Sequence, residues 1–149
     1  MIFLKTEDEI ELLRQSNLLV GKTLAEVAKL VKPGVTTREL DKVAEEFIRD
    51  NGATPTFKGF PNQYGEPFPA SICTSVNEQV VHGIPDKKNI LKDGDIISLD
   101  TGVIYKGYQS DAARTHAVGE ISPEDQKLID VTKQSFFEGM KMAKAGNHL

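Results

Sequence analysis

The first long stretch of the chain places its apolar residues with the period of an α-helix. Thr6 and Glu9 have the capping-box spacing, in which each side chain satisfies a free backbone N–H at the start of a helix. Pro33-Gly34 ends the stretch. Its apolar stripe consists of Ile10, Leu12, Leu13, Leu18, Leu19, Leu24, Val27, Ala28 and Val31. The pattern predicts an amphipathic helix that packs one face against a core.

Two further helices are predicted from the same kind of pattern. One begins near Thr36 or Thr37 and ends at Asn51-Gly52, with Leu40, Val43, Ala44 and Phe47 facing inward. The other begins at Ser122-Pro123, which places a serine cap before a proline at the first helical position. It runs to Ala145-Gly146. Lys-Ala-Gly follows this last helix, as Lys-Pro-Gly follows the first. The final segment therefore resembles the start of a second copy of the chain's opening motif.

Residues 53–70 contain four prolines among several aromatic residues. No regular helix tolerates this density of proline. Composition alone favours a long surface loop. A loop that lines a ligand site stays open as the alternative, because loops of this length in a domain are often functional.

The central third of the chain predicts β-strands. Residues 72–76 and 79–81 are short β-prone runs. Residues 96–104 and 108–118 are longer runs, separated by a turn at residues 105–107. Two such runs around a short glycine-containing turn predict a β-hairpin.

Asp100 and Asp111 interrupt the two arms of this hairpin. Side chains alternate along each strand, so the turn decides how the carboxylates lie. A two-residue turn at Tyr105-Lys106 would place them directly opposite, and one at Lys106-Gly107 would place them on a diagonal. A three-residue loop would send them to opposite faces.

Two interpretations of this acidic pair are open. Both aspartates could cap turns or face solvent, with Arg114, assigned to the same face as Asp111, as a salt-bridge partner. Alternatively, carboxylates held this close repel each other unless a cation relieves them, and oxygen ligands on adjacent strands can bridge two divalent ions.

The remaining candidate residues give weaker indications. His82 follows a β-prone run and precedes a glycine, a position more typical of a hydrogen-bonded bystander than of a ligand. Cys73 is more typical of a small buried residue than of a reactive one. His116 and His148 are interpreted as ordinary surface or terminal residues.

Composition excludes several classes of protein. The chain has 149 residues, 27% charged residues and a net charge of −4, without a basic run that would attract nucleic acid. No apolar run is long enough for a membrane span, and the acidic N-terminus argues against a signal peptide. A single cysteine fits a reducing cytoplasm.

Several strings resemble those of type I methionine aminopeptidases. Residues 75–85, SVNEQVVHGIP, are similar to the motif that precedes the active site in that family. Residues 92–95, KDGD, followed by Asp100 and Asp111, are similar to its metal-binding hairpin. Residues 32–37, residues 68–73 and the opening helix extend the likeness over the whole chain.

The resemblance implies a pita-bread α/β fold, in which two similar halves enclose two metal ions. Asp100 would chelate one metal and Asp111 would bridge both. His82 would not bind metal but would hydrogen-bond the substrate near the scissile peptide. Phe68 and Cys73 would line the pocket for the methionine side chain.

The implied reaction removes the initiator methionine from nascent polypeptides in the cytoplasm, near ribosomes. A metal-bridging hydroxide would attack the first peptide bond, and manganese, iron, cobalt or zinc would serve as the two divalent ions. Neither DNA nor a membrane is expected as a partner. Enzymes specific for X-Pro termini, and binding proteins that share the fold without its chemistry, are the alternatives.

The sequence departs from the family in one respect. The family also uses one histidine and two glutamates from its C-terminal half, and residues 1–149 do not contain them. We therefore expect a single domain that is the truncated N-terminal part of a catalytic domain, that binds metal weakly and that is inactive alone. The face left open would favour self-association.

Overall fold

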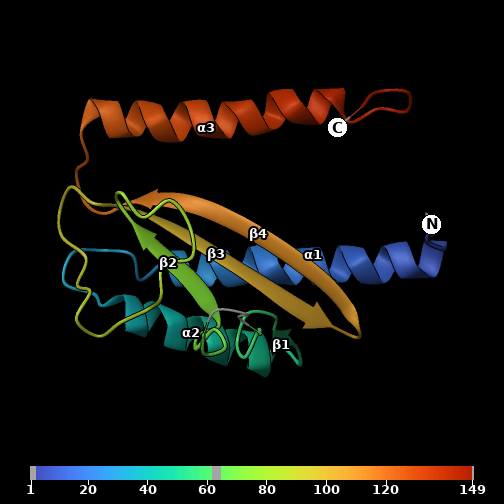
Figure 1. Cartoon of the computed structure of the whole chain (residues 1–149), viewed down its shortest axis with the longest axis horizontal. Helices are drawn as coiled ribbons and strands as arrows, with labels where there is room; N and C mark the ends of the chain where they lie inside the picture. Colours follow the sequence, from blue (N-terminus) through green and yellow to red (C-terminus); the bar gives the residue numbers. More distant parts are fainter. Residues whose placement is uncertain (1–2, 62–64, 149) are drawn as a thin grey trace.

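The computed structural model describes residues 3–61 and 65–148 (Figure 1). Its first two helices are α1, Glu7–Ala28, and α2, Thr37–Asp50, and both begin at capping boxes. In α1 the predicted pair Thr6 and Glu9 forms the box. In α2 the pair is Thr36 and Glu39, which the sequence analysis did not single out. Both predicted helices are thus confirmed.

A four-stranded antiparallel sheet lies beside these helices. Its strands are β1, Thr54–Pro55, β2, Ile72–Val76, β3, Ile96–Tyr105, and β4, Tyr108–Ala117. The long strand β3 is central: β4 pairs with one of its edges, and β1 and β2 pair with successive parts of the other. The predicted hairpin and the strand at residues 72–76 are confirmed.

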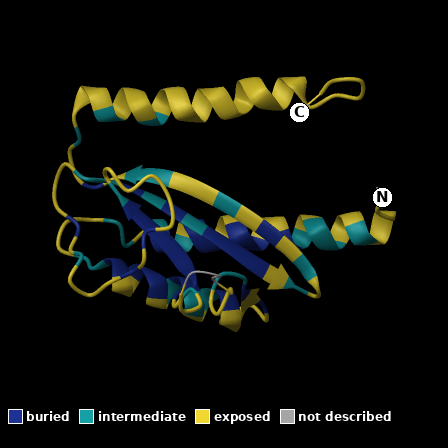
Figure 2. Ribbon diagram, in the orientation of Figure 1, coloured by how far each residue is buried: buried dark blue, intermediate teal, exposed yellow. Residues whose placement is uncertain are grey.

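The core lies between the sheet and helices α1 and α2, which cover one face (Figure 2). Alternate residues of β3 point into it: Ile97, Leu99, Thr101 and Val103 are each fully buried. Their partners on the helices include Leu24, Val27, Leu40, Ala44 and Ile48. Because residues of a strand alternate between faces, the side chains at 98, 100 and 102 point to the other face.

The hairpin turns through two residues. Tyr105 pairs with Tyr108, so Lys106 and Gly107 form the turn, and both have positive φ, 50° and 85°. Two successive residues with positive φ match a type I′ turn, whose twist suits the twist of the flanking strands. Glycine adopts this backbone without strain, and the turn therefore fixes the register of the whole hairpin.

Two predictions about regular structure need correction. Residues 79–81 do not form a strand: Asn77-Glu78 is a turn, and Val80 and Val81 are exposed without a neighbouring strand to pair with. Conversely, the predicted loop at residues 53–70 contains the short strand β1, which pairs with the end of β3. Residues 62–64 of that loop lie outside the described residues.

The third helix, α3, Pro123–Met142, stands apart from the rest of the molecule (Figure 1). Ser122 caps it and Pro123 occupies its first turn, as predicted. None of its residues is buried. Most of the helix is coloured as exposed in Figure 2. Its exposed apolar side chains are Leu128, Val131, Phe136, Phe137, Met140 and Met142. Within the described part of the chain, no helix is long and apolar enough to cross a membrane.

Candidate functional site

Asp100 and Asp111 lie on the face of the sheet that α1 and α2 leave uncovered. Asp100 pairs with Ala113, and Asp111 pairs with Gly102 two residues further along β3. The two carboxylates therefore share one face and lie on a diagonal, as predicted for a turn at Lys106-Gly107. They are close enough for a side-chain hydrogen bond. The hairpin geometry that a metal pair requires is present.

The two carboxylates influence each other electrostatically. Burial raises the pKa of Asp100 above its ordinary value, and the negative charge of Asp111 raises it further, while His82 lowers it. An unpaired carboxylate is stabilised in its neutral form by a like charge nearby. A divalent cation placed between the two groups would remove that repulsion. The site thus has the electrostatic character of a cation site.

Cys73 lies directly across from Asp100 on β2. It is buried, and burial together with the charges of Asp100 and Asp111 raises the pKa of its thiol to about 12. The thiolate, not the thiol, is the nucleophile and metal ligand. At neutral pH Cys73 therefore forms an uncharged, apolar part of the wall beside the acidic pair, as the sequence interpretation held.

His82 stands at the outer edge of β2, in a segment clamped to that strand. The Gly83 carbonyl accepts a hydrogen bond from Thr74 N at 2.8 Å, and Gly83 N donates to Ser75 Oγ at 3.0 Å. His82 itself has a positive φ of 59°. Its side chain is exposed, and its charge acts on Asp100. The structure therefore brings His82 to the acidic pair.

Gly83 allows this close approach. A Cβ atom at this position would lie 2.4 Å from the Thr74 carbonyl oxygen and 2.8 Å from Ser75 Cα. Both are backbone atoms, so the segment could not stay in place with any side chain at residue 83. The small residue after His82 is a requirement of packing rather than of turn conformation.

Phe68 lies in the loop between β1 and β2. Its ring meets that of Phe57 edge-on, with 6.4 Å between the centroids. Backbone hydrogen bonds from Gly59 N to Phe68 O and from Phe68 N to Phe60 O fold this loop on itself. Phe57 was not among the sequence candidates. Its position in a segment rich in aromatic residues was the signal available.

The face of the sheet that bears the acidic pair also carries Thr56, which the sequence analysis missed. Thr56 N donates to the Gly102 carbonyl at 3.0 Å, and this bond extends the pairing of β1 with β3. Since Gly102 pairs with Asp111 on its other side, Thr56, Gly102 and Asp111 form one row across three strands. Only the register of β1, which has two residues, reveals this row.

Arg114 is not the partner that the sequence interpretation assigned to Asp111. It pairs with Leu99, whose side chain points into the core, so it lies on the opposite face of β4 from Asp111. The physical reason is that three residues separate the two positions, and faces alternate with a period of two. The interpretation of the acidic pair as half of a salt bridge with Arg114 is therefore wrong.

The other two histidines, His116 and His148, are not part of the acidic site. His116 is half-buried rather than an ordinary surface residue, and its Nε2 has no hydrogen-bond partner among residues 3–61 and 65–148. Burial lowers its pKa, and the charge of Arg114 lowers it further. It pairs with Ile97 and so lies on the face away from the acidic pair. His148 is exposed, as expected.

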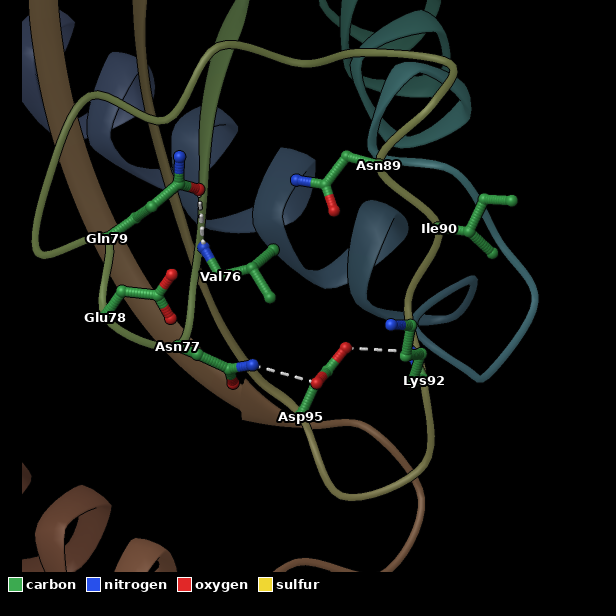
Figure 3. A pocket seen from close by; sticks show the side chains of 8 residues that line it. All are labelled: Val76, Asn77, Glu78, Gln79, Asn89, Ile90, Lys92 and Asp95. Atoms are coloured by element: carbon green, nitrogen blue, oxygen red, sulfur yellow. Dashed lines mark hydrogen bonds between the residues drawn. The ribbon is translucent and has the colours of Figure 1, made fainter.

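A polar pocket of about 280 Å³ lies between the turn after β2 and the segment that leads into β3 (Figure 3). Asn77 Nδ2 donates to Asp95 Oδ1 at 2.9 Å, and Asp95 Oδ2 accepts from Lys92 N at 2.8 Å. Asn77 Oδ1 also accepts from Ile96 N. These bonds fix the start of β3 against the end of β2. The pocket contains neither Asp100 nor Asp111.

The acidic pair fits part of a metal site. Carboxylate oxygens are ligands that hard divalent cations prefer. Among the described residues, however, no group of three or more histidine, cysteine, aspartate or glutamate side chains is arranged to hold a metal ion. Two carboxylates neutralise only half the charge of two divalent ions. Further ligands must come from another segment or molecule if two ions are to bind tightly.

The fold and the acidic pair define a class, the metal-dependent peptidases of the pita-bread fold. Residues 11–149 match metallopeptidase family M24, and the chain belongs to this family. It is 56% identical to methionine aminopeptidase from Clostridium acetobutylicum and 47% identical to methionine aminopeptidase 1 from Bacillus subtilis, over its whole length in each case.

Solved structures agree. A methionine aminopeptidase from Thermotoga maritima superposes on 97% of the chain with a TM-score of 0.88 and 38% identity. A prolidase from Pyrococcus horikoshii, at 20% identity and a TM-score of 0.79, shares the fold. The chain spans 58% of both the Clostridium and the Bacillus relatives and 56% of the Thermotoga structure. The remainder of each relative has no counterpart here.

Proposed function

We propose that this chain is the N-terminal part of a methionine aminopeptidase catalytic domain, and that residues 1–149 form one domain of it. The observation that carries the proposal is the diagonal of Asp100 and Asp111 on one sheet face, in a chain similar throughout to methionine aminopeptidases. The complete polypeptide would remove the N-terminal methionine from nascent polypeptides. Two lines of support carry the proposal: the relatives are methionine aminopeptidases, and the acidic pair has the oxygen ligands that a divalent metal site needs.

Asp100 and Asp111 are the residues that hold the metal ions in this proposal. Asp100 would serve as a chelating ligand and Asp111 as a ligand shared between the ions, and their register places both carboxylates on one face. When bound, divalent ions supply a Lewis acid and lower the pKa of water. Manganese, iron, cobalt and zinc all accept such oxygen ligands. The carboxylates hold these ions on the sheet face, where the substrate's first peptide bond would lie.

His82 acts on the substrate rather than on the metal. Its imidazole is exposed at the edge of β2, while its backbone is held by Gly83 against Thr74 and Ser75. A side chain that is free in solvent on a fixed backbone can hydrogen-bond an incoming peptide. We assign His82 the role of donating or accepting a hydrogen bond near the scissile bond.

Cys73 and Phe68 form part of the pocket for the methionine side chain. Cys73 is an uncharged thiol beside Asp100, because its pKa is raised to about 12. Phe68 contributes a ring that packs against Phe57. A thioether makes favourable contacts with aromatic rings and with other polarizable groups. These neighbours therefore suit methionine better than a charged side chain.

The cellular setting follows from the same activity. Nascent polypeptides are the substrate class, so we place the protein in the cytoplasm, where it works near ribosomes. The net charge of −4 gives no support for DNA as a partner. Neither the sequence nor the described helices support a membrane partner.

The 149-residue chain alone should release no methionine. Residues 3–61 and 65–148 do not give its acidic pair the third and further ligands that tight binding of two ions requires. On helix α3, the side chains of Phe136, Phe137 and Met140 are each at least half exposed, at 63%, 50% and 56%. Apolar surface of this kind favours association, so we propose that the isolated chain self-associates. A monomer in light scattering across a tenfold concentration range would contradict this.

An X-Pro peptidase is the competing function, because an Xaa-Pro dipeptidase from Bacillus anthracis also shares the fold at 28% identity and a TM-score of 0.68. The methionine aminopeptidases are more similar in both sequence and structure. Rates on Met-Ala-Ser and Ala-Pro peptides separate the two activities.

The decisive test joins this chain to the C-terminal part of the Clostridium acetobutylicum relative. We expect this hybrid to release methionine from Met-Ala-Ser when Mn²⁺ is supplied. Asp111→Asn, which keeps the shape of the side chain, should abolish activity and Mn²⁺ binding. Asp50→Asn, at an exposed position of α2, is the matched control and should change neither. Full activity of the Asp111→Asn hybrid would refute the proposed function.

A further inference from the structure

The row formed by Thr56, Gly102 and Asp111 has an unusual composition for a sheet face. Residues directly opposite on neighbouring strands share a face, with Cβ atoms about 5 Å apart. Glycine in the middle of the row leaves a gap between the outer two side chains. Thr56 fills part of it: its Cβ and Oγ1 atoms both lie 3.1 Å from the place where a Cβ atom of residue 102 would stand. The threonine side chain thus lies over Gly102, whose partner on the other side is Asp111.

The Thr56 hydroxyl is buried without a partner. Its Oγ1 atom is inaccessible to solvent and makes no hydrogen bond to any of the residues that the structure describes. Buried hydroxyl groups are nearly always hydrogen-bonded, because an unmade bond in the interior is unfavourable. An orphaned donor at this place indicates a partner that appears in another state of the site. Across Gly102, the next side chain in the row is the Asp111 carboxylate, which can accept a hydrogen bond.

We propose that Thr56 is a positioning residue for Asp111, and that its hydroxyl donates a hydrogen bond to the Asp111 carboxylate when that carboxylate binds a cation. The proposal rests on the proposed metal site. In the structure Asp111 lies on the diagonal from Asp100, and the Thr56 hydroxyl has no partner among the described residues. A cation held by both carboxylates would fix the Asp111 carboxylate and leave one of its oxygens to accept from Thr56.

Gly102 leaves the space that Thr56 occupies. A Cβ atom at residue 102 would lie 3.1 Å from Thr56 Cβ and Oγ1 and 3.0 Å from the Ser110 carbonyl oxygen, so a side chain there would compete with Thr56 for space. The hydroxyl can therefore reach the acidic pair either from Thr56, as here, or from a small hydroxyl residue at 102 with residue 56 cut back. A hydroxyl moved from residue 56 to residue 102 should therefore restore metal binding if Thr56 acts as a donor. It should not do so if Thr56 only fills space.

Binding of Mn²⁺ to the hybrid of this chain with the C-terminal part of the Clostridium acetobutylicum relative, followed by paramagnetic broadening of its amide NMR signals, tests the proposal without any activity assay. We expect Thr56→Val, which keeps the shape but removes the hydroxyl, to weaken Mn²⁺ binding about tenfold, as is typical when a partner of a metal ligand is lost. Thr56→Ser should bind within about twofold of the wild type, since it keeps the donor. Thr54→Val, on the same strand but opposite Ile104, is the matched control and should bind normally.

The double variant Thr56→Ala, Gly102→Ser moves the hydroxyl across the row. We expect it to recover most of the affinity that Thr56→Ala alone loses. Amide spectra and thermal unfolding of each variant verify that the sheet is intact, and Asp111→Asn marks the signals that report on the site.

The outcomes separate the two proposals. Equal Mn²⁺ affinity in Thr56→Val and the wild type would overturn the role of Thr56, and so would equal losses in Thr56→Ser and Thr56→Val. Absence of Mn²⁺ binding in the wild type, or binding that survives Asp111→Asn, would instead contradict the metal site and the proposed function itself.

Discussion

Replacement of Gly83 by alanine should destabilise the chain far more than a typical glycine-to-alanine change. The new methyl group would lie 2.4 Å from the Thr74 carbonyl oxygen and 2.8 Å from Ser75 Cα, so the segment must move away from β2. That movement breaks the hydrogen bonds from Thr74 N to Gly83 O and from Gly83 N to Ser75 Oγ.

The magnitude follows from these two effects. Overpacking of a fitted position lowers the free energy of unfolding by about 1–3 kcal/mol. Two lost hydrogen bonds, at about 0.5–1.5 kcal/mol each, add a comparable amount. We therefore expect a decrease of about 2–6 kcal/mol, a large share of the stability of an ordinary domain.

Gly21→Ala is the matched control. Gly21 lies in the middle of α1, and a Cβ atom there meets nothing within 4 Å. Alanine should raise the free energy of unfolding by about 0.5–1 kcal/mol at such a position. Since both variants restrict the unfolded chain equally, the difference between them isolates the clash at residue 83. Urea unfolding followed by circular dichroism measures both values.

The position of His82 should change together with stability. Because Gly83 anchors the backbone of His82, we expect the alanine variant to shift the amide signals of His82 and Thr74 while those of α1 stay in place. A Gly83→Ala variant whose free energy of unfolding lies within about 0.5 kcal/mol of the wild type would refute the close-packing argument.

Three further predictions concern the same region. Asp41→Ala should lower the free energy of unfolding by about 2–5 kcal/mol in urea titrations, because the buried Asp41 carboxylate accepts from Ser71 N at 2.7 Å and Ile72 N at 3.3 Å, and both donors would be left unpaired; an unchanged midpoint would contradict this. Cys73 should react with iodoacetamide at pH 8 much more slowly than a free thiol does, since its pKa is raised to about 12; labelling at the rate of free cysteine would refute its burial. Asp100 has a raised pKa in the folded chain, so its contribution to stability is fully present below the unfolded pKa and is lost as pH rises through the folded value. Asp100→Asn should therefore gain stability relative to the wild type as pH rises from 4 toward 7 in metal-free buffer, and a constant difference would rule out the coupling.

Local signals in the sequence were sufficient for the helices and the hairpin. The capping pair at Thr6 and Glu9 lies three residues apart, and the two residues satisfy each other's backbone N–H groups locally. The turn at Lys106-Gly107 likewise depends on a glycine and on the strands that flank it. The diagonal of Asp100 and Asp111 follows from that turn alone, which is why counting residues could predict it.

Features that depend on distant neighbours were not predictable in this way. Residues 79–81 have the composition of a strand, yet they form no strand pairing among the described residues. Thr54–Pro55 has little strand character, yet it pairs with the end of β3. Thr56 therefore enters the site through a register that sequence patterns do not contain. The placement of Arg114 beside Asp111 failed for a different reason, because it disregarded the alternation of faces along β4.

Two features of the chain call for a partner: the acidic pair on the sheet, whose charges repel, and helix α3, whose apolar side chains are exposed. Burial and the charge of Asp111 raise the pKa of Asp100, and the described residues offer the acidic pair no third ligand. Helix α3 keeps its apolar side chains exposed. Under the proposed function, one second body would supply ligands to the sheet face and cover α3. Repulsion between carboxylates is tolerated in a fold only where a cation or a proton relieves it, and large apolar side chains are left exposed only where a partner meets them. Joining this chain to the C-terminal part of the Clostridium acetobutylicum relative should therefore raise Mn²⁺ affinity and the free energy of unfolding together, rather than one at the expense of the other.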